Sequence, residues 1–161
     1  MAQAPITLRL ARAGDALAMS RMSRDFIENG LDWKYSPGRI AALVADQETV
    51  ALAACDGAAL QAFAVMQFGA ERAHLVLMCV EPALRRQGVG RRLIAWLVES
   101  ARVAGIVSIH LELRADNEAA HTFYDSLGFV ETVVVPGYYQ GRVSARRMQL
   151  LLRPPAPDRP G

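Results

Sequence analysis

Residues 80–92 read VEPALRRQGVGRR and decide the fold, because they join an apolar strand pattern to a helix pattern through a loop of arginine and glycine. The first turn of a helix has unpaired backbone N–H groups and the positive end of the helix dipole, so it attracts anions. Gly88 and Gly90 lack side chains that would keep a phosphate away from those N–H groups. Positive charge around the loop comes from Arg85, Arg86, Arg91 and Arg92. This pattern predicts a site for a diphosphate.

The loop alone leaves a second interpretation open, a solvated arginine-rich loop before a helix. It lacks the Gly-Lys-Ser/Thr ending of a Walker loop. Its glycines are also spaced differently from those of a dinucleotide-binding fingerprint. The surrounding sequence must therefore decide between the two interpretations.

Length and composition favour one small domain. The 161 residues suit a single core, which we assign to residues 1–152, with a flexible proline-rich tail at 153–161. A net charge of +2 is too small to indicate nucleic-acid binding. Cys55 and Cys79 lie in apolar runs without metal-site spacing, so we expect reduced buried thiols and no metal. Without a signal peptide or an apolar run of about 20 residues, we expect a cytoplasmic protein that does not bind membranes.

Hydrophobic periodicity predicts an α/β fold. Strand patterns occupy residues 6–11, 49–55, 59–68, 74–80, 107–113, 129–135 and 144–152. Helix patterns occupy residues 15–29, 37–46, 89–104 and 118–127, and we expect Asp15, Ser36 and Asn117 to cap three of them. Residues 107–113 alternate strictly, with Ser108, His110 and Glu112 on the polar face.

Two separated motifs resemble those of the GCN5-related N-acetyltransferases, the GNAT superfamily. They are V80-E-P-A-L-R-R-Q-G-V-G90 and N117-E-A-A-H-T-F-Y-D-S-L-G-F129, with a helix and a strand between them. The resemblance is strong over residues 73–129. It implies a mixed, twisted sheet of about seven strands flanked by about four helices, whose central strands splay apart to admit acetyl-CoA.

The resemblance also implies roles for individual residues. The strand end at Cys79 and Val80 would offer backbone hydrogen bonds to the pantetheine arm of acetyl-CoA. The pyrophosphate would bind to the loop formed by Arg85, Arg86, Gln87, Gly88, Val89, Gly90 and Arg91. Asn117 would contact the same co-substrate, and Tyr124 would lie near its sulfur.

Acetyl transfer to an amine needs a base for the ammonium proton and benefits from an acid for the leaving thiolate. Glu112 is the candidate base, directly or through water, and His110, about 6.6 Å along the same face, is its rival. Tyr124 is the candidate acid, because a phenol has an ordinary pKa of about 10. The alternatives are a solvated strand face for Glu112 and plain packing for Tyr124.

The stretch L111-E-L-R-A-D-N-E-A-A-H-T-F-Y-D-S-L-G-F129 is similar to that of bacterial ribosomal-protein N-terminal alanine acetyltransferases. In that group, tyrosines like Tyr138 and Tyr139 line a peptide groove, whereas hairpin packing is the alternative here. Trp33 and Tyr35 lie in a loop that does not resemble the equivalent loop of those acetyltransferases. They are candidates to reshape or close the groove.

We therefore predict an N-acetyltransferase in which a primary amine attacks acetyl-CoA directly in a ternary complex. A protein or peptide N-terminus is the leading acceptor. The alternatives are an acetyltransferase for a small amine, such as a polyamine, amino acid or drug, and a non-catalytic acyl-CoA sensor. The resemblance is also compatible with a homodimer.

Overall fold

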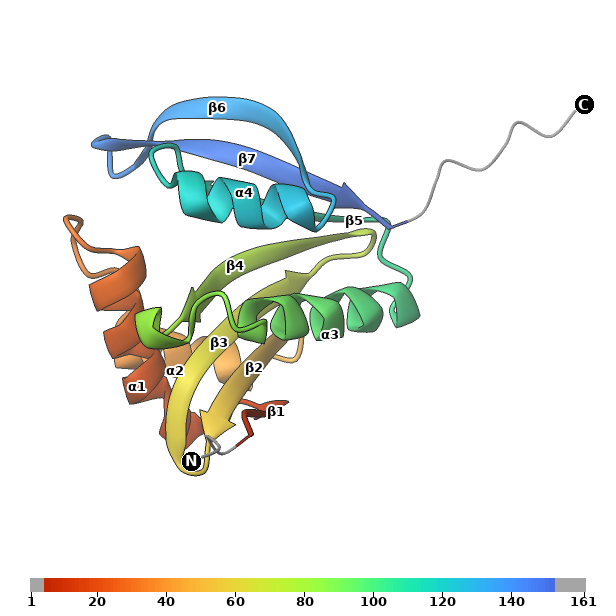
Figure 1. Cartoon of the computed structure of the whole chain (residues 1–161). Helices are drawn as coiled ribbons and strands as arrows, with labels where there is room; N and C mark the ends of the chain where they lie inside the picture. Colours follow the sequence, from red (N-terminus) through yellow and green to blue (C-terminus); the bar gives the residue numbers. More distant parts are fainter. Residues whose placement is uncertain (1–4, 153–161) are drawn as a thin grey trace, which may run out of the picture.

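Seven strands form one mixed sheet in the computed structural model, which describes residues 5–152. Their order across the sheet is β1-β2-β3-β4-β5-β7-β6 (Figure 1). Only β4 and β5 are parallel among the neighbouring pairs. The strands are β1 (Thr7–Leu10), β2 (Thr49–Asp56), β3 (Ala59–Phe68), β4 (Arg72–Val80), β5 (Ser108–Arg114), β6 (Val130–Tyr139) and β7 (Val143–Leu151).

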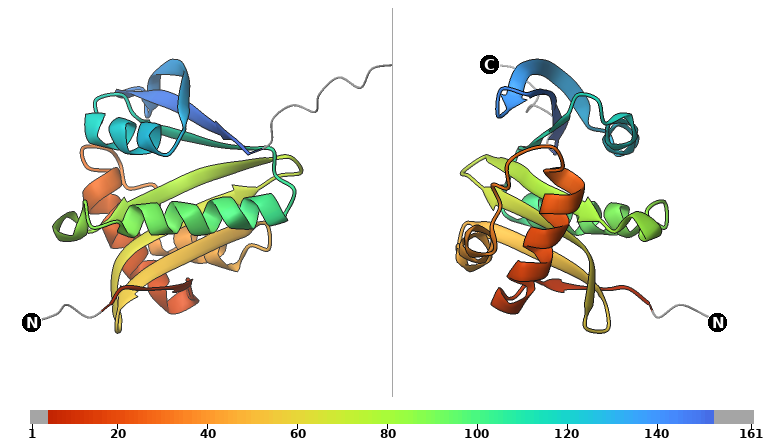
Figure 2. Two further views of the ribbon diagram at one scale, coloured as in Figure 1. Left: turned by 45° about the vertical axis from the view of Figure 1, so that its right-hand side comes forward. Right: turned by 90° about the vertical axis from the view of Figure 1, so that its left-hand side faces the viewer.

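Helices cover both faces of the sheet (Figure 2). One face carries α1 (Ala16–Met22) and α2 (Pro37–Ala45), and the other carries α3 (Val89–Val103) and α4 (Glu118–Ser126). The predicted caps of α2 and α4 are confirmed. The Ser36 hydroxyl accepts a hydrogen bond from the Arg39 N–H, and the Asn117 side-chain oxygen accepts one from the Ala120 N–H. No helix within residues 5–152 has the length and apolar character needed to cross a membrane.

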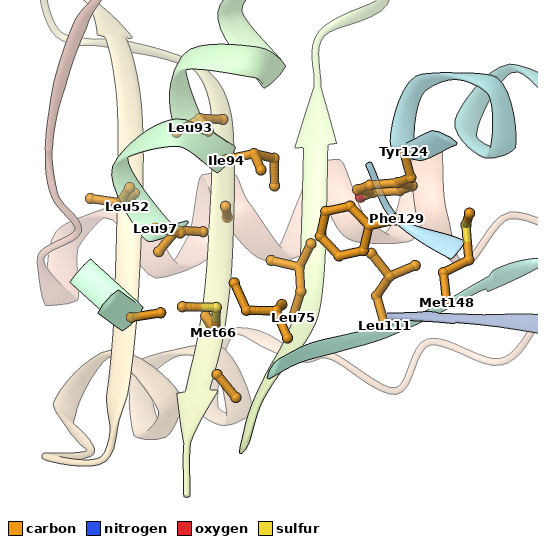
Figure 3. Close-up of a cluster of buried hydrophobic side chains, with 14 of the residues drawn as sticks. Leu52, Met66, Leu75, Leu93, Ile94, Leu97, Leu111, Tyr124, Phe129 and Met148 are labelled. Atoms are coloured by element: carbon orange, nitrogen blue, oxygen red, sulfur yellow. The ribbon is translucent and has the colours of Figure 1, made fainter. Parts of the chain in front are cut away.

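The hydrophobic core has two parts, one on each face of the sheet. The larger part lies under α3 and α4, and it includes one face of α3, formed by Val89, Leu93, Leu97 and Ala101. Figure 3 shows this part running from Leu52 and Leu93 across Leu75 to Tyr124 and Phe129. The smaller part packs α1 and α2 against strands β2 to β4. The core thus fixes all four helices to one sheet.

The centre of the sheet opens because β4 and β5 pair over only part of their length. Their register runs from Arg72 opposite Ser108 to Leu75 opposite Leu111. The next residue of β4, Val76, is a bulge, because β3 pairs with Leu75 and Leu77 through consecutive residues. A bulge bends the strand that contains it, so β4 turns away from β5 at this point. The predicted mixed sheet with splayed central strands is confirmed.

One local prediction was wrong. Asp15 does not cap α1 with its side chain. Its carboxylate forms an ion pair with Arg9, at 2.7 Å, and accepts the Arg12 N–H, so a 3-10 turn at Ala13–Asp15 precedes α1. The first helical segment ends in a π-helical turn at Ile27, close to the predicted end near residue 29. The predicted tail at 153–161 lies outside the described residues.

Candidate functional site

The loop between β4 and α3 has the backbone geometry of an anion site. Arg86 and Gly88 have positive φ angles, of 67° and 84°, and α3 begins directly afterwards at Val89. Left-handed residues interspersed in a loop turn successive N–H groups toward one side, forming a nest for anions. A Cβ built on Gly88 meets no atom within 4 Å, so the space beside this residue is open. The predicted diphosphate loop thus has an accessible backbone.

Gly90 has a different structural role from the one expected. A Cβ at this position would lie 3.3 Å from Cζ of Phe123 and 3.6 Å from Cγ2 of Val80. The missing side chain therefore lets Phe123 of α4 approach the first turn of α3. The space beside Gly88 is open, whereas Gly90 allows the side chain of Phe123 to approach α3.

The hydrogen-bonding pattern of β4 decides which backbone groups face the opening. The Glu81 N–H donates to the Gln61 carbonyl of β3, at 2.8 Å. Successive residues of an antiparallel strand point their backbone groups to opposite sides, so Cys79 also bonds toward β3. Met78 and Val80 face away from β3, and the Val80 carbonyl accepts a hydrogen bond from the Arg85 guanidinium.

This alternation corrects one predicted pair of residues. Val80 presents its backbone to the opening as expected, but Cys79 does not, and Met78, which the sequence analysis missed, does. The sequence does contain a signal for Met78. The β2–β3–β4 meander makes β4 antiparallel to β3, so every second residue of β4 turns its backbone away from β3, and Met78 is two residues before Val80. Cys79 is buried, and burial raises the pKa of its thiol to about 12, which keeps it protonated and unreactive.

Tyr124 extends from α4 toward β4. Its ring packs edge-to-face against Phe123 and Phe129, at centroid distances of 5.1 and 5.5 Å. Its hydroxyl lies 3.9 Å from the Met78 sulfur. Burial raises the pKa of Tyr124, so the phenol keeps its proton at neutral pH. The residue is therefore both a packing residue and a protonated hydroxyl at the opening.

Glu112 lies on the face of β5 that points away from α4 and Tyr124. It is not a solvated strand residue. One carboxylate oxygen is 2.6 Å from Nε2 of His74, and the other is 3.0 Å from Nε of Arg147. Burial raises the pKa of Glu112, but the hydrogen bonds and charges of these partners outweigh burial and lower it overall. His110 is bonded to a different group, the Ser108 hydroxyl, at 2.8 Å. Glu112 is thus ionised at neutral pH.

Tyr35, Tyr138 and Tyr139 gather near this carboxylate. Tyr138 and Tyr139 lie at the end of β6, which continues past the predicted residue 135, and their rings meet edge-to-face at 4.9 Å. Burial raises the pKa of all three tyrosines, and the negative charge of Glu112 contributes in each case. The strand predicted over residues 129–135 therefore extends to include both tyrosines, and Tyr138 is exposed.

The segment before α2, residues 28–36, is tied to the rest of the site. The buried Glu28 carboxylate accepts the N–H groups of Lys34 and Tyr35, at 2.7 and 3.1 Å. The Gln140 side chain exchanges two hydrogen bonds with the Asp32 backbone, at 2.9 and 3.1 Å. We call this contact the Asp32–Gln140 bridge, and it joins the segment to the β6–β7 turn.

Trp33 lies in the same segment and is half exposed. The Arg24 guanidinium lies over its ring, at 5.3 Å from the centroid. The sequence pattern of the segment did not reveal the Glu28 anchor or the bridge, because both depend on residues brought together only by the fold.

An open hollow of about 400 Å³ adjoins Glu112 on the same face. It lies where β4 and β5 are still paired, beside the point at which they separate. Its lining is Gln67, Phe68, Gly69, Arg72, Ala73, His74, His110, Glu112 and Arg147. Glu112 therefore lies between the tyrosines and an open space.

Comparisons with known proteins agree with this arrangement. The family model described as an acetyltransferase (GNAT) domain matches residues 43–131. The ribosomal protein bS18 alanine N-acetyltransferase of Salmonella typhimurium is 38% identical over 94 residues, which cover 56% of this chain and 64% of that protein. The alignment thus spans less than two thirds of that relative.

Solved structures extend the similarity over nearly the whole fold. The ribosomal-protein-S18-alanine N-acetyltransferase of Escherichia coli is 26% identical, with a TM-score of 0.80, covering 98% of this chain and 100% of that one. Ard1 of Thermoplasma volcanium is 25% identical, also with a TM-score of 0.80, covering 92% of this chain and 99% of that one.

Proposed function

Because the chain belongs to the GNAT acetyltransferase family, we propose that it transfers the acetyl group of acetyl-CoA to a primary amine. One observation carries the proposal. The opening between β4 and β5 has the anion loop and Tyr124 on one side, and Glu112 with three tyrosines on the other. A thioester that enters from the first side meets an amine that enters from the second. This favours direct attack in a ternary complex.

The residues along the opening fit acetyl-CoA. The backbone groups of residues 85–91 would hold the pyrophosphate, because Gly88 leaves their surface open. The backbone of Met78 and Val80 would bind the pantetheine arm, with Asn117 as a further contact. Acetyl-CoA supplies the activated acetyl thioester. Its energy-rich bond removes the need for a covalent enzyme intermediate on the protonated Cys79 thiol.

In the proposed reaction, the amine nitrogen bonds to the carbonyl carbon as the carbon–sulfur bond breaks. A backbone N–H of Met78 or Val80 stabilises the oxygen while it carries negative charge. The Tyr124 hydroxyl gives its proton to the leaving thiolate and regains one from solvent. The ammonium loses two protons in all: Glu112 supports loss of the first to solvent before the attack, and the second leaves the nitrogen for solvent after the bond has formed, which balances the proton that Tyr124 regains. The acetylated amine and free CoA then leave.

We propose a protein or peptide N-terminus as the acceptor. The names of the bS18-specific relatives support this choice. Tyr35, Tyr138 and Tyr139 offer aromatic and hydroxyl groups for an extended backbone next to Glu112. Trp33, on the exposed surface of the same segment, would contact residues further along the peptide.

A small amine is the second candidate acceptor. The Asp32–Gln140 bridge and the ion pair between Asp32 and Arg142, at 3.6 Å, connect the two segments that border the tyrosines. Such a connection narrows the approach and favours a short acceptor over a folded protein surface.

The test is acetyl-CoA-dependent release of CoA by the purified protein with N-terminal peptides, lysine peptides, polyamines, amino acids and aminoglycosides. Release with N-terminal peptides, including one that starts with alanine, supports the leading proposal. Release with small amines alone selects the second candidate. A folded protein that binds acetyl-CoA and releases no CoA with any acceptor, ribosomal proteins included, contradicts both.

A further inference from the structure

Each oxygen of Glu112 accepts a hydrogen bond from one donor. His74 and Arg147 bind one oxygen each, and the carboxylate side chain is only 11% exposed. A base must offer a lone pair to the proton that it takes, and these donors use two of the roughly four lone-pair sites of the carboxylate. The two partners also stabilise the ionised form, which weakens the carboxylate as a base. The contacts therefore suit Glu112 better to orienting a neighbour than to taking a proton itself.

His74 is the neighbour that can take the proton. It lies on β4 directly opposite His110 of β5, in the part of the sheet where the two strands are paired. Its side chain is 42% exposed and lines the open hollow beside Glu112. An ionised carboxylate only accepts hydrogen bonds, so the 2.6 Å contact requires the proton to lie on Nε2. The second ring nitrogen, Nδ1, is then the one that can accept a proton.

We propose that His74 is the base of the acetyl transfer, and that Glu112 positions its ring and stabilises the imidazolium that forms. The inference rests on the proposed function and refines how the ammonium proton is lost. Nδ1 takes that proton through water in the hollow, which gives an imidazolium with both nitrogens protonated. After the transfer, Nδ1 returns the proton to solvent, and neutral His74 remains bonded to Glu112. A carboxylate behind a histidine base is the arrangement of the Ser-His-Asp triad.

The charged groups around His74 are consistent with this role. Glu112 of β5 contacts His74 directly, and Arg147 of β7 and Arg72 of β4 line the same hollow. His110 lines the same hollow, but it is bonded to Ser108 and has no carboxylate partner. Burial and the charges of Arg72 and His74 lower the pKa of His110, which leaves it a weaker base. His110 is thus a matched control, because it shares the hollow and lacks the carboxylate.

The decisive experiment is rescue of the His74→Ala variant by added imidazoles. We expect kcat to fall by about 10²–10⁴-fold with little change in KM, the usual contribution of a general base. The hollow can admit imidazole, so a series of substituted imidazoles should restore turnover, with rates that increase with the pKa of the additive. In the rescued reaction, the acidic limb of the pH profile of turnover should move with the pKa of the added imidazole. The ionisation of the acceptor amine is common to all samples and does not produce this movement.

Two variants and one spectroscopic measurement control the result. Added imidazole should not change the turnover of His110→Ala or of Glu112→Gln. His74→Gln should be as slow as His74→Ala, although glutamine has nearly the volume of the ring and keeps a hydrogen-bond donor. Nitrogen-15 NMR should find the Nε2 proton of His74 in the wild type and a changed signal in Glu112→Gln. Calorimetric titration with acetyl-CoA verifies that each variant is folded.

Turnover by His74→Ala within a few-fold of the wild type would overturn the inference. Rescue rates that do not depend on the pKa of the added imidazole would overturn it as well. Those results leave the proposed acetyltransferase activity intact. A wild-type protein without turnover on any acceptor would instead overturn the proposed function, and the role of His74 with it.

Discussion

The Tyr124 hydroxyl of α4 lies 3.9 Å from the Met78 sulfur of β4, and so the two residues meet across the opening at the centre of the sheet. A thioether sulfur is a weak hydrogen-bond acceptor, and this contact leaves the phenol proton available to a better acceptor. Met78 also presents its backbone to the opening. The pair therefore marks the place where we expect the thioester sulfur to arrive.

Tyr124→Phe should reduce kcat by about 10²–10⁴-fold, the range for loss of a general acid, and leave acetyl-CoA affinity largely unchanged. Folding should be little affected, because the ring contacts with Phe123 and Phe129 remain. Steady-state kinetics and calorimetric titration measure the two effects. A variant with unchanged kcat would assign Tyr124 to packing alone.

Glu112→Gln should destabilise the fold in a pH-dependent manner. The pKa of Glu112 in the fold lies below its ordinary value of 4.5, so its ionisation stabilises the fold above pH 4.5. That contribution is lost as the pH falls through the lower, folded pKa. We expect a free-energy difference of unfolding of about 1 kcal/mol near neutrality that shrinks in acid. Denaturant unfolding of both proteins across this range measures it.

Glu131→Gln is the matched control for that experiment. Glu131 also pairs with an arginine, Arg146, at 3.6 Å, but its side chain is 38% exposed. An exposed pair contributes little, so this variant should match the wild type at every pH. The proposed ion-pair contribution would be contradicted if the wild type and Glu112→Gln differed in free energy of unfolding by the same amount at pH 7 and in acid.

Gly88→Glu should weaken acetyl-CoA binding by about tenfold or more, which corresponds to about 1.4 kcal/mol. The substitution places a negative charge at the anion loop and a side chain in open space. Gly88→Asn is the control, because asparagine tolerates the positive φ of 84° and adds no charge. Calorimetry that gives equal affinities for the glutamate and asparagine variants would remove this loop from the pyrophosphate site.

Gly90→Ala should lower the free energy of unfolding by about 1 kcal/mol, because its Cβ would crowd Phe123. The same substitution should instead stabilise a Phe123→Leu protein by about 0.5–1 kcal/mol, the usual gain of alanine over glycine in a helix. Chemical denaturation of all four proteins completes the cycle. Equal effects in both backgrounds would show that the two residues do not interact.

Gln140→Asn should raise KM for a peptide acceptor several-fold and leave KM for acetyl-CoA unchanged. Gln140 has a φ of 56°, which asparagine adopts readily, but the shorter side chain breaks the Asp32–Gln140 bridge. Loss of the bridge frees the segment that carries Trp33 and Tyr35. An unchanged peptide KM, with altered kinetics for a small amine, would favour the second candidate acceptor.

Local sequence patterns predicted the features that depend on neighbours along the chain. The alternation of residues 107–113 identified a strand with a polar face that carries His110 and Glu112. The capping residues Ser36 and Asn117 started the helices at the predicted positions. These predictions succeeded because caps and strand alternation depend on residues only a few positions apart.

The sequence by itself thus determined the α/β class, the order of elements and the open loop at Gly88. Only the tertiary structure decided that Glu112 binds His74 and Arg147, which are 38 and 35 residues away. It also decided that Met78, and not Cys79, faces the opening, and that Gly90 accommodates Phe123. The reason is physical. These contacts depend on strand register and on a bulge at Val76, and a shift of one residue would turn each side chain to the other face.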